Sequence, residues 1–591
     1  MARNKFDVDE SLDQEFNASQ VKRILDYIKP HRKAISFVIF MMVLTTTAVY
    51  VGPTLMAVLV DKAIPEGNVP LVLILSGVFT LIYLFNSAVV KQRIRIMNEV
   101  AQNIIHTLRR DVFVHLQRLP FAYYDSRPHG KILIRVVNYV NSLNDLLQNG
   151  IINLFTDLFS LLIITIYLFA LNPKLTLYSM IGLPVLVLVL FLLKKVQRVR
   201  WQAVSRKQSN LTAYLAETLS GMKVTQSFAR EEENKRIFAT QSQENVKAWM
   251  KAVRVNFLLW PLSENISVIS ISVMYVVGVS MIAGGETSVG VLIAFASYIS
   301  MFWAPIMNLG NFYNQILNVA AYLERIFETL DEKPLIEDAP DAGVMPQIQG
   351  SVSFEHVNFS YEEGQRILKD VSFKVEPGET IALVGATGSG KTTIVNLISR
   401  FYDIQEGKIL IDDTDISSVT IASLRSQMGV MMQDSFIFSG TVMDNIRYGK
   451  LDATDEECIS AAQTVMAHEF IMELEDGYMT EVNERGSRLS VGQRQLISFA
   501  RALLADPRIL ILDEATSSID TRTEKALQQG LERLLHGRTS FVIAHRLSTI
   551  KNADRIFYID AGVITESGTH DELMTLKGQY WQLYSAQYAL M

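Results

Sequence analysis

The residues with the clearest chemistry form a glycine-rich loop between a short apolar strand, predicted over Thr380–Val384, and a helical run over residues 393–401. Glycines let the backbone turn tightly enough for its N–H groups to face a phosphate chain, and a helix N-terminus adds partial positive charge. The candidate phosphate-binding residues are Gly385, Ala386, Thr387, Gly388, Ser389, Gly390, Lys391, Thr392 and Thr393. Lys391 is expected to reach the β- and γ-phosphates, and Thr392 to bind Mg²⁺.

Two adjacent carboxylates end a second apolar run. Ile509–Asp513 has the composition of a buried parallel strand, and Glu514 follows it directly. Phosphoryl transfer depends mainly on positioning and charge neutralisation. Asp513 therefore suits the Mg²⁺ shell, and Glu514 suits polarisation of an attacking water. Together with the glycine loop, these acids predict an enzyme that hydrolyses ATP.

A third segment, Leu489-Ser490-Val491-Gly492-Gln493, resembles the signature of the ATP-binding cassette (ABC) proteins. In that family the segment caps the γ-phosphate bound to the opposite protomer, so that two cassettes enclose two ATP molecules. The resemblance implies that Ser490, Gly492 and Gln493 bind nucleotide, with ATP and Mg²⁺ as the cofactors.

Other positions in the same order along the chain also match the ABC pattern. The resemblance implies that Tyr361 stacks on adenine and that Gln433 serves both the Mg²⁺ shell and hydrolysis. It assigns Asp520, which ends the segment Ser517-Ser518-Ile519-Asp520, to the nucleotide site, and His545 to the γ-phosphate.

The sequence departs from the ABC pattern at Val491, which replaces the first glycine of the signature. A β-branched side chain restricts the backbone, and it would crowd a phosphate that the backbone must approach. Exporters built from two different chains often carry one weakened ATP site. The partner is therefore either a second copy of this chain or a different half-transporter, and the sequence leaves both open.

Composition indicates that the ATPase is attached to a membrane domain. The chain has 591 residues, of which 49% are apolar, and a net charge of −6. It is too long for one domain and too apolar for an ordinary soluble enzyme. Six runs are long enough to span a bilayer: residues 34–60, 69–90, 150–171, 175–193, 255–283 and 289–309. Lysines and arginines crowd the tail and the stretches after the second and fourth runs, which predicts that both termini are cytosolic.

Two long polar stretches, between the second and third spans and between the fourth and fifth, are predicted to be helical arms. Each would extend on the order of 40 Å into the cytosol. Their tips, residues 119–125 and 217–223, resemble the coupling helices of ABC exporters. The same resemblance assigns Glu484 to a contact with the partner's coupling helices, although Asn483 stands where the family usually has glycine.

The predicted fold is an all-α six-helix transmembrane domain followed by an α/β P-loop ATPase domain of the ABC type with a helical subdomain. Residues 1–33 form a cytosolic tail with an amphipathic helix, and residues 34–330 form the transmembrane domain. Residues 331–350 form a proline-containing linker, and residues 351–591 form the cassette. The single cysteine, Cys458, excludes an intramolecular disulfide.

These features predict an exporter that uses alternating access of a dimer to move amphipathic or hydrophobic compounds across a bacterial plasma membrane. A lipid flippase and a peptide exporter are the alternatives, and an ATP-gated channel or regulator fits less well because the hydrolytic residues are all present. Membrane lipids and a small amphipathic substrate are the expected partners, and no nucleic acid is expected. Asp157 and Glu264 lie inside apolar spans, where they either line a cavity for cationic molecules or form hydrogen bonds between helices.

Overall fold

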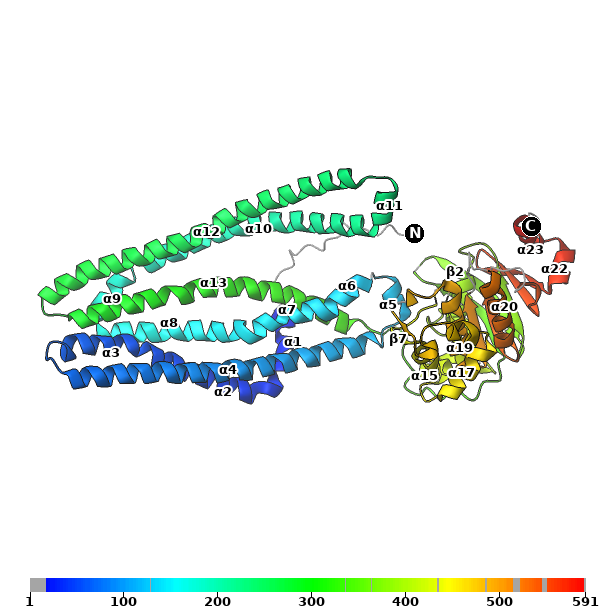
Figure 1. Cartoon of the computed structure of the whole chain (residues 1–591), viewed down its shortest axis with the longest axis horizontal. Coiled ribbons are helices and arrows are strands. Elements are labelled where there is room, and N and C mark those ends of the chain that lie inside the picture. Colours follow the sequence, from blue (N-terminus) through cyan, green and yellow to red (C-terminus); the bar gives the residue numbers. More distant parts are fainter. Residues whose placement is uncertain are drawn as a thin grey trace. The chain divides into compact units, whose positions relative to one another are not determined.

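The computed structural model describes residues 18–127, 129–334, 336–362, 364–432, 435–483, 486–513, 521–544 and 550–588. The chain divides into two compact units. The helical unit comprises Met1–Gln117 and His129–Asp331, and the α/β unit comprises Arg118–Pro128 and Glu332–Met591. A helical domain followed by a sheet-containing domain confirms the predicted fold class (Figure 1).

The helical unit is built from long apolar helices joined by short turns (Figure 1). Its α-helices are α1 (Ala18–Ile28), α2 (Arg32–Tyr50), α3 (Gly52–Val58), α4 (Val69–Leu116), α6 (His129–Ile134), α7 (Val140–Asp145), α8 (Ile151–Leu171), α9 (Pro173–Ser179), α10 (Gly182–Ser220), α11 (Met222–Ser227), α12 (Glu231–Ala283) and α13 (Val289–Asp331). Short 3₁₀ or π segments continue some of them: η1 (Lys29–His31), η2 (Leu59–Ala63), η3 (Arg135–Tyr139) and η4 (Leu146–Gly150).

Among the residues that the structure describes, 5 helical stretches are long and apolar enough to cross a membrane, and they correspond to five of the predicted spans. Most of the fourth predicted span, residues 175–193, falls in a shorter apolar helical stretch over Pro173–Val189, in which a turn separates α9 from α10. Pro184 lies in the first turn of α10 and has no backbone N–H to donate to the carbonyl of Met180. The Leu183 N–H donates to that carbonyl instead, at 3.0 Å. Hydropathy detects the apolar run but not the break that proline introduces.

Polar contacts connect the first and last spans of the helical unit. Tyr298 of α13 is fully buried, and its hydroxyl donates to the carbonyl of Tyr50 at 2.6 Å and lies 2.8 Å from the Thr54 hydroxyl. Asp61 of η2 accepts hydrogen bonds from the Gly290 N–H and the Ser288 hydroxyl. An acidic side chain at the start of α13 also interacts favourably with the helix dipole.

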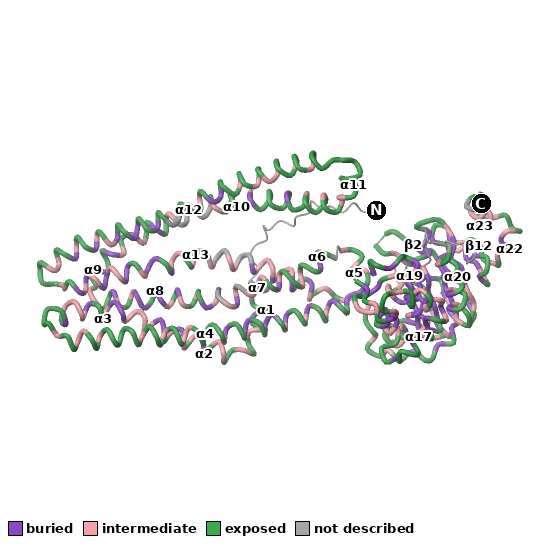
Figure 2. Tube along the Cα trace, viewed as in Figure 1, coloured by how far each residue is buried: buried purple, intermediate pink, exposed green. Residues whose placement is uncertain are grey.

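The hairpin of α10 and α12 leaves much of its surface uncovered in the single chain (Figure 2). Its exposed apolar side chains include Val199, Trp201, Trp249 and Phe257. Apolar surface of this extent is normally covered by lipid or by another chain.

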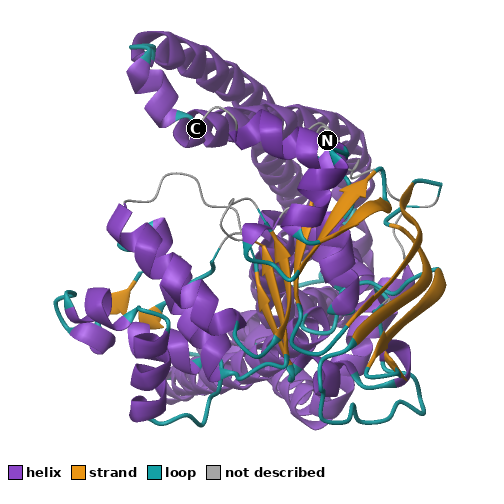
Figure 3. Cartoon of the chain, turned by 90° about the vertical axis from the view of Figure 1, so that its right-hand side faces the viewer, coloured by secondary structure: helices purple, strands orange, loops and turns teal. Residues whose placement is uncertain are grey.

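The α/β unit contains two larger sheets and a set of surrounding helices (Figure 3). Its strands are β1 (Val352–Ser360), β2 (Arg366–Val375), β3 (Thr380–Val384), β4 (Glu406–Ile411), β5 (Thr414–Asp415), β6 (Met428–Met431), β7 (Gly440–Thr441), β8 (Glu481–Val482), β9 (Ile509–Asp513), β10 (Thr539–Ile543), β11 (Arg555–Asp560) and β12 (Val563–Gly568). Its helices are α5 (Phe121–Asp125), α14 (Lys391–Ile398), α15 (Ile421–Arg425), α16 (Val442–Arg447), α17 (Asp455–Thr464), α18 (His468–Met472), α19 (Val491–Leu504), α20 (Thr521–Leu535), α22 (His570–Leu576) and α23 (Gln579–Tyr588), with 3₁₀ turns η5 (Ile416–Ser418) and η6 (Gly477–Met479).

The six-stranded sheet, in the order β12-β11-β3-β10-β9-β6, determines where the predicted chemistry lies. β10 pairs in parallel with β3 on one side and with β9 on the other. The glycine loop after β3 and the acid at the end of β9 therefore share the carboxyl edge of the sheet, where ligands bind in open α/β folds. The four-stranded sheet, β2-β1-β4-β5, is antiparallel and carries Tyr361 at the end of β1.

The end of the predicted linker is packed into the α/β unit. Met345 and Ile348 are buried in its core. The Asp412 carboxylate accepts hydrogen bonds from three consecutive backbone N–H groups, those of Gln349, Gly350 and Ser351. Asp412 thereby anchors the chain at its entry to β1.

We expect Asp412→Ala to lower the free energy of unfolding by about 1–3 kcal/mol, because three backbone N–H groups, two of them partly buried, lose a charged acceptor. Asp413→Ala is the matched control. Both positions have positive φ, +48° and +61°, so the backbone cost of alanine is shared, but Asp413 is exposed. Thermal unfolding of the full-length protein measures the difference. Equal losses in the two variants would show that the anchor contributes nothing.

Candidate nucleotide site

The glycine loop has the backbone geometry that a phosphate cradle requires. Gly385, Gly388 and Gly390 have φ values of +148°, +83° and +112°. A Cβ at Gly385 would lie 2.2 Å from the carbonyl oxygen of Ile559, and one at Gly390 would lie 2.8 Å from Leu368. Side chains at these positions would be strained, so the loop depends on glycine.

Lys391 begins α14 and is largely buried beneath the loop. Its ammonium donates to the carbonyl oxygens of Gly385 at 2.9 Å and Ala386 at 2.8 Å. Burial lowers the pKa of Lys391, and the negative charge of Asp513 acts in the opposite direction. The structure therefore brings the sequence-predicted lysine and acid into the same electrostatic environment.

Three hydroxyls of the loop and of α14 differ in their surroundings. The Ser389 Oγ is buried and, among the described residues, makes no hydrogen bond. Thr392 is exposed, and Thr393 is buried. An orphaned hydroxyl inside a glycine cradle is the feature expected of a site that a phosphate completes. The donor set also fits Mg²⁺, since the Thr392 hydroxyl and the Asp513 carboxylate are oxygen ligands and Mg²⁺ keeps most of its shell for phosphate and water.

Tyr361 is one of the residues that line a pocket of about 310 Å³ beside the four-stranded sheet. Its ring is 45% exposed, and its hydroxyl donates to the Thr393 Oγ1 at 3.2 Å. The pocket is lined by Asn358, Phe359, Ser360, Tyr361, Glu362, Gly364, Arg366, Gln405 and Glu406.

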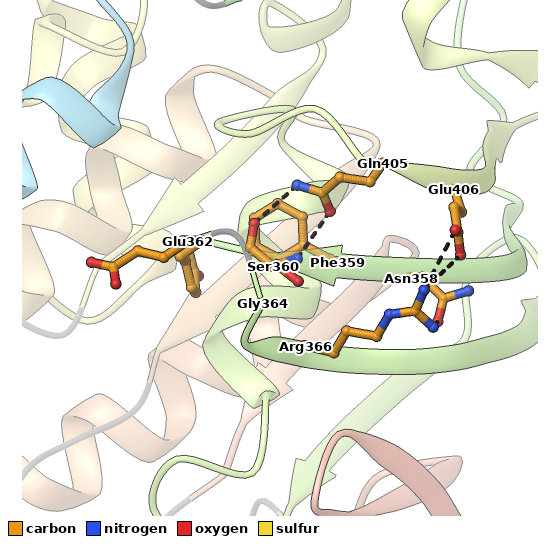
Figure 4. Close-up of a pocket in the computed structure, with 9 residues that line it drawn as sticks. Asn358, Phe359, Ser360, Glu362, Gly364, Arg366, Gln405 and Glu406 are labelled. Atoms are coloured by element: carbon orange, nitrogen blue, oxygen red, sulfur yellow. Dashed lines mark hydrogen bonds and ion pairs between the residues drawn. The ribbon is translucent and has the colours of Figure 1, made fainter.

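Sequence reasoning missed two supports of this pocket, because nothing in the local pattern marks them. Gln405 exchanges two hydrogen bonds of 2.9 Å with the backbone of Ser360 (Figure 4). The ring of Tyr402 packs edge-on against Tyr361, with centroids 4.9 Å apart.

The signature residues form the start of α19. Ser490 is the N-cap and Gln493 is the third helical residue, and each side chain accepts a hydrogen bond from the backbone N–H of the other. Gly492 is buried, whereas Val491 is 51% exposed in the first turn. Val491 is the first residue of α19, so the expected restriction of its backbone does not prevent the helix from beginning there. Crowding of a ligand by Val491 stays a prediction.

Five assigned residues lie outside the described residues. They are Gln433, Glu484, Glu514, Asp520 and His545. Their assigned roles stay predictions. The described part of the site consists of the loop, Lys391, Thr392, Thr393, Asp513, Tyr361 and the start of α19.

The chain is similar to ABC transporters over most of its length. Residues 35–306 match the family model described as the ABC transporter transmembrane region, and residues 368–517 match the model described as ABC transporter.

Two curated bacterial proteins illustrate the similarity. The uncharacterized ABC transporter ATP-binding protein YknV of Bacillus subtilis (strain 168) is 48% identical over 591 residues, covering 100% of this chain and 98% of that protein. An ATP-dependent lipid A-core flippase of Desulfotalea psychrophila is 36% identical over 571 residues, covering 97% of this chain and 100% of that protein.

A solved structure shares the fold. The structure of a bacterial Atm1-family ABC exporter with ATP bound superimposes with a TM-score of 0.80 at 28% sequence identity, covering 94% of this chain and 98% of that chain.

We expect Ser490→Ala to reduce ATP hydrolysis at least about tenfold, since Ser490 is the predicted contact to a γ-phosphate. Loss of its cap alone would cost only about 1 kcal/mol of stability. Thr454→Ala is the matched control, because Thr454 and Glu457 form the same reciprocal cap on α17. Both variants should lose similar thermal stability, and only Ser490→Ala should lose activity. Equal ATPase rates in the two variants would contradict the assignment.

Proposed function

The chain belongs to the ABC transporter family, as a membrane exporter driven by ATP hydrolysis, and from this premise we propose how its own residues bind the nucleotide and what it carries. The observation that carries the proposal is the common position of Lys391 and Asp513 at the carboxyl edge of the sheet, beneath three glycines with positive φ. In this site Lys391 exchanges the loop carbonyls for the β- and γ-phosphates.

Each described residue has a distinct task in the proposed site. Tyr361, which lines the pocket, stacks on adenine, and Thr393 holds the tyrosine in place through its hydroxyl. Thr392 and Asp513 hold Mg²⁺, which when bound neutralises charge on the phosphate oxygens. Glu514 orients and polarises the attacking water.

Residues of both protomers are proposed to bind the γ-phosphate. His545 holds it from the same chain. Ser490 and Gln493 of the opposite protomer complete the site, so that the capping bonds of α19 are exchanged for bonds to phosphate when two cassettes close.

Transporters of this type function as dimers, and we take the partner to be a second copy of this chain. Lys391, Asp513 and the capped start of α19 are all present in one polypeptide, and Val491 lies in the first turn of α19. The exposed apolar face of the α10–α12 hairpin offers surface for that copy. Closure of the paired cassettes would drive alternating access of the spans, with both termini in the cytosol.

The experiment that tests the homodimer is ATPase activity and native mass of the chain purified alone in lipid nanodiscs. We expect a dimer that hydrolyses ATP cooperatively, and a Glu514→Gln dimer whose turnover falls at least about a hundredfold. A monomer, or a nearly inactive wild-type dimer, would point to a different partner whose signature completes the site. Unchanged turnover in Glu514→Gln would contradict the role of that acid.

The proposed substrates are amphipathic molecules, because the transport domain is an apolar helical bundle with few ionisable groups inside it. Two of its relatives are named ATP-dependent lipid A-core flippases, and lipids are amphipathic molecules. A drug exporter and a lipid flippase share every feature of the ATP site. Stimulation of ATPase activity that depends on the lipid headgroup would favour the flippase.

The two intramembrane acids differ in their surroundings. Asp157 of α8 is buried and accepts a hydrogen bond from the Asn308 amide of α13 at 3.3 Å, whereas Glu264 of α12 is exposed in the single chain. This contact joins α8 to α13, and it corresponds to one of the two alternatives from the sequence, a hydrogen bond between helices. A buried carboxylate with one neutral partner still attracts a cation, so both roles can belong to one residue.

We expect Asp157→Asn to reduce ATPase stimulation by cationic amphipaths at least about fivefold, because asparagine keeps the hydrogen bond to Asn308 but removes the charge. Stimulation by neutral lipids should be unchanged. Glu264→Gln is the control for loss of an acid within an apolar span. An equal effect of Asp157→Asn on both classes of compound would leave Asp157 with a structural role only.

A further inference from the structure

The short helix α5 belongs to the α/β unit by its packing, although α4 and α6, its neighbours in sequence, belong to the helical unit. The ring of Phe121 lies 5.7 Å from the ring of Phe401. The Oδ2 of Asp125 accepts a hydrogen bond of 3.0 Å from the Tyr402 hydroxyl. Both partners of α5 lie just after α14, the helix that begins with Lys391.

Tyr402 also contacts the aromatic residues of the pocket described above. Its ring centroid is 4.9 Å from that of Tyr361 at an interplanar angle of 84°, and 5.8 Å from that of Phe359. Edge-to-face pairs at these distances are attractive and set the relative orientation of the rings. One side chain therefore contacts α5 through its hydroxyl and Tyr361 through its ring.

Two arginines anchor the backbone of the segment that carries Tyr402 to neighbouring parts of the α/β unit. Arg400 is buried with a φ of +50°, and its guanidinium donates to the carbonyls of Ile416 and Val419 at 3.1 Å each. Arg425 lies 4.7 Å from the centroid of the Phe401 ring and donates to the Arg400 carbonyl at 2.7 Å. These contacts restrain the backbone directly before Tyr402, so that displacement of one contact of its side chain would be transmitted to the other.

The Tyr402 hydroxyl is protonated, as a hydrogen-bond donor to Asp125 must be. Burial, and then the neighbouring Asp125 carboxylate, raise the pKa of Tyr402 well above its ordinary value. The hydroxyl therefore keeps its proton throughout the physiological range and can donate to Asp125.

We propose that Tyr402 is a positioning residue that links α5 to the base of the nucleotide: its hydroxyl holds Asp125, and its ring supports the adenine-stacking Tyr361. This inference rests on the proposed function, which assigns adenine to Tyr361. Linkage is reciprocal, so a base that orders Tyr361 must also favour the docked position of α5. A triphosphate without a base fills the glycine loop but does not act on Tyr402.

Hydrogen–deuterium exchange of residues 121–126 tests the link in the full-length protein in lipid nanodiscs, with EDTA present to prevent hydrolysis. We expect saturating ATP to slow exchange of this segment at least about threefold in the wild type, and inorganic triphosphate to slow it much less. Tyr402→Phe and Asp125→Ala should lose the effect of ATP, whereas Asp125→Asn, which keeps a hydrogen-bond acceptor, should retain most of it.

Tyr478→Phe is the matched control for loss of a tyrosine hydroxyl. Tyr478 is buried, and its hydroxyl lies 2.9 Å from the His468 Nδ1 in another part of the α/β unit. This variant should respond to ATP as the wild type does. Binding of ATP to Tyr402→Phe is checked by the thermal shift that ATP produces, which should persist.

The role of the ring is tested by a larger change. Tyr402→Leu should raise the KM for ATP about three- to tenfold and leave the Ki of inorganic triphosphate, measured as an inhibitor of ATP hydrolysis, unchanged. Tyr402→Phe should restore the KM. A purely structural role would instead lower thermal stability and change KM and Ki together.

Different experimental outcomes would overturn the role of Tyr402 and the proposed function. A wild-type protein that shows no thermal shift and no hydrolysis with ATP would overturn the proposed function itself. A wild-type protein that hydrolyses ATP, but in which ATP and inorganic triphosphate slow exchange of α5 equally, would overturn the role of Tyr402 alone. Retention of the ATP effect in Tyr402→Phe would do the same.

Discussion

The α/β unit depends on keeping one ammonium group charged where little water reaches it. Lys391 is 9% exposed, and burial by itself favours the neutral amine. Two loop carbonyls and the charge of Asp513 offset part of that cost, although the pKa of Lys391 is still lowered overall. Because Asp513 reaches this position only from the end of β9, with β10 between β9 and β3, the sheet order is a condition for the site. The glycine loop, the parallel strands and the acid therefore form one electrostatic arrangement.

The same unit contains a helix that belongs to a different stretch of sequence. α5 has five residues, too few for a helix that is stable without tertiary packing. Its structure is supported by Phe401 and Tyr402, which follow α14 directly. A segment of this kind responds to its partner, since its conformation is maintained by the surface that it contacts. The contacts of α5 therefore belong to the packing of the α/β unit, although α4 and α6 belong to the helical unit.

Local patterns predicted most of the architecture. Five of the six apolar runs lie in helical stretches long enough to span a membrane, since hydropathy over about 20 residues records the cost of burying polar groups in lipid. Hydropathy did not predict the break in the helix before Gly182, because a proline in the first turn of a helix leaves the hydropathy of the run almost unchanged. Val491 was expected to restrict the backbone, yet α19 begins at this residue. In both cases the position within a helix, rather than the residue type, decided the outcome.

The sequence by itself determined the chemistry of the site: a loop of glycines, a lysine, an acid at the end of a strand, and the signature segment that contains Ser490. Each is encoded in a few neighbouring residues, so spacing alone reveals it. Tertiary structure decided which of these groups share an environment. The fold places Tyr402 in contact with both Tyr361 and Asp125, and Asp125 lies 277 positions from Tyr402 in the sequence. Such ring packing and side-chain hydrogen bonds form only after the backbone has brought distant segments together. No local pattern records such a contact, since its partners lie on separate elements.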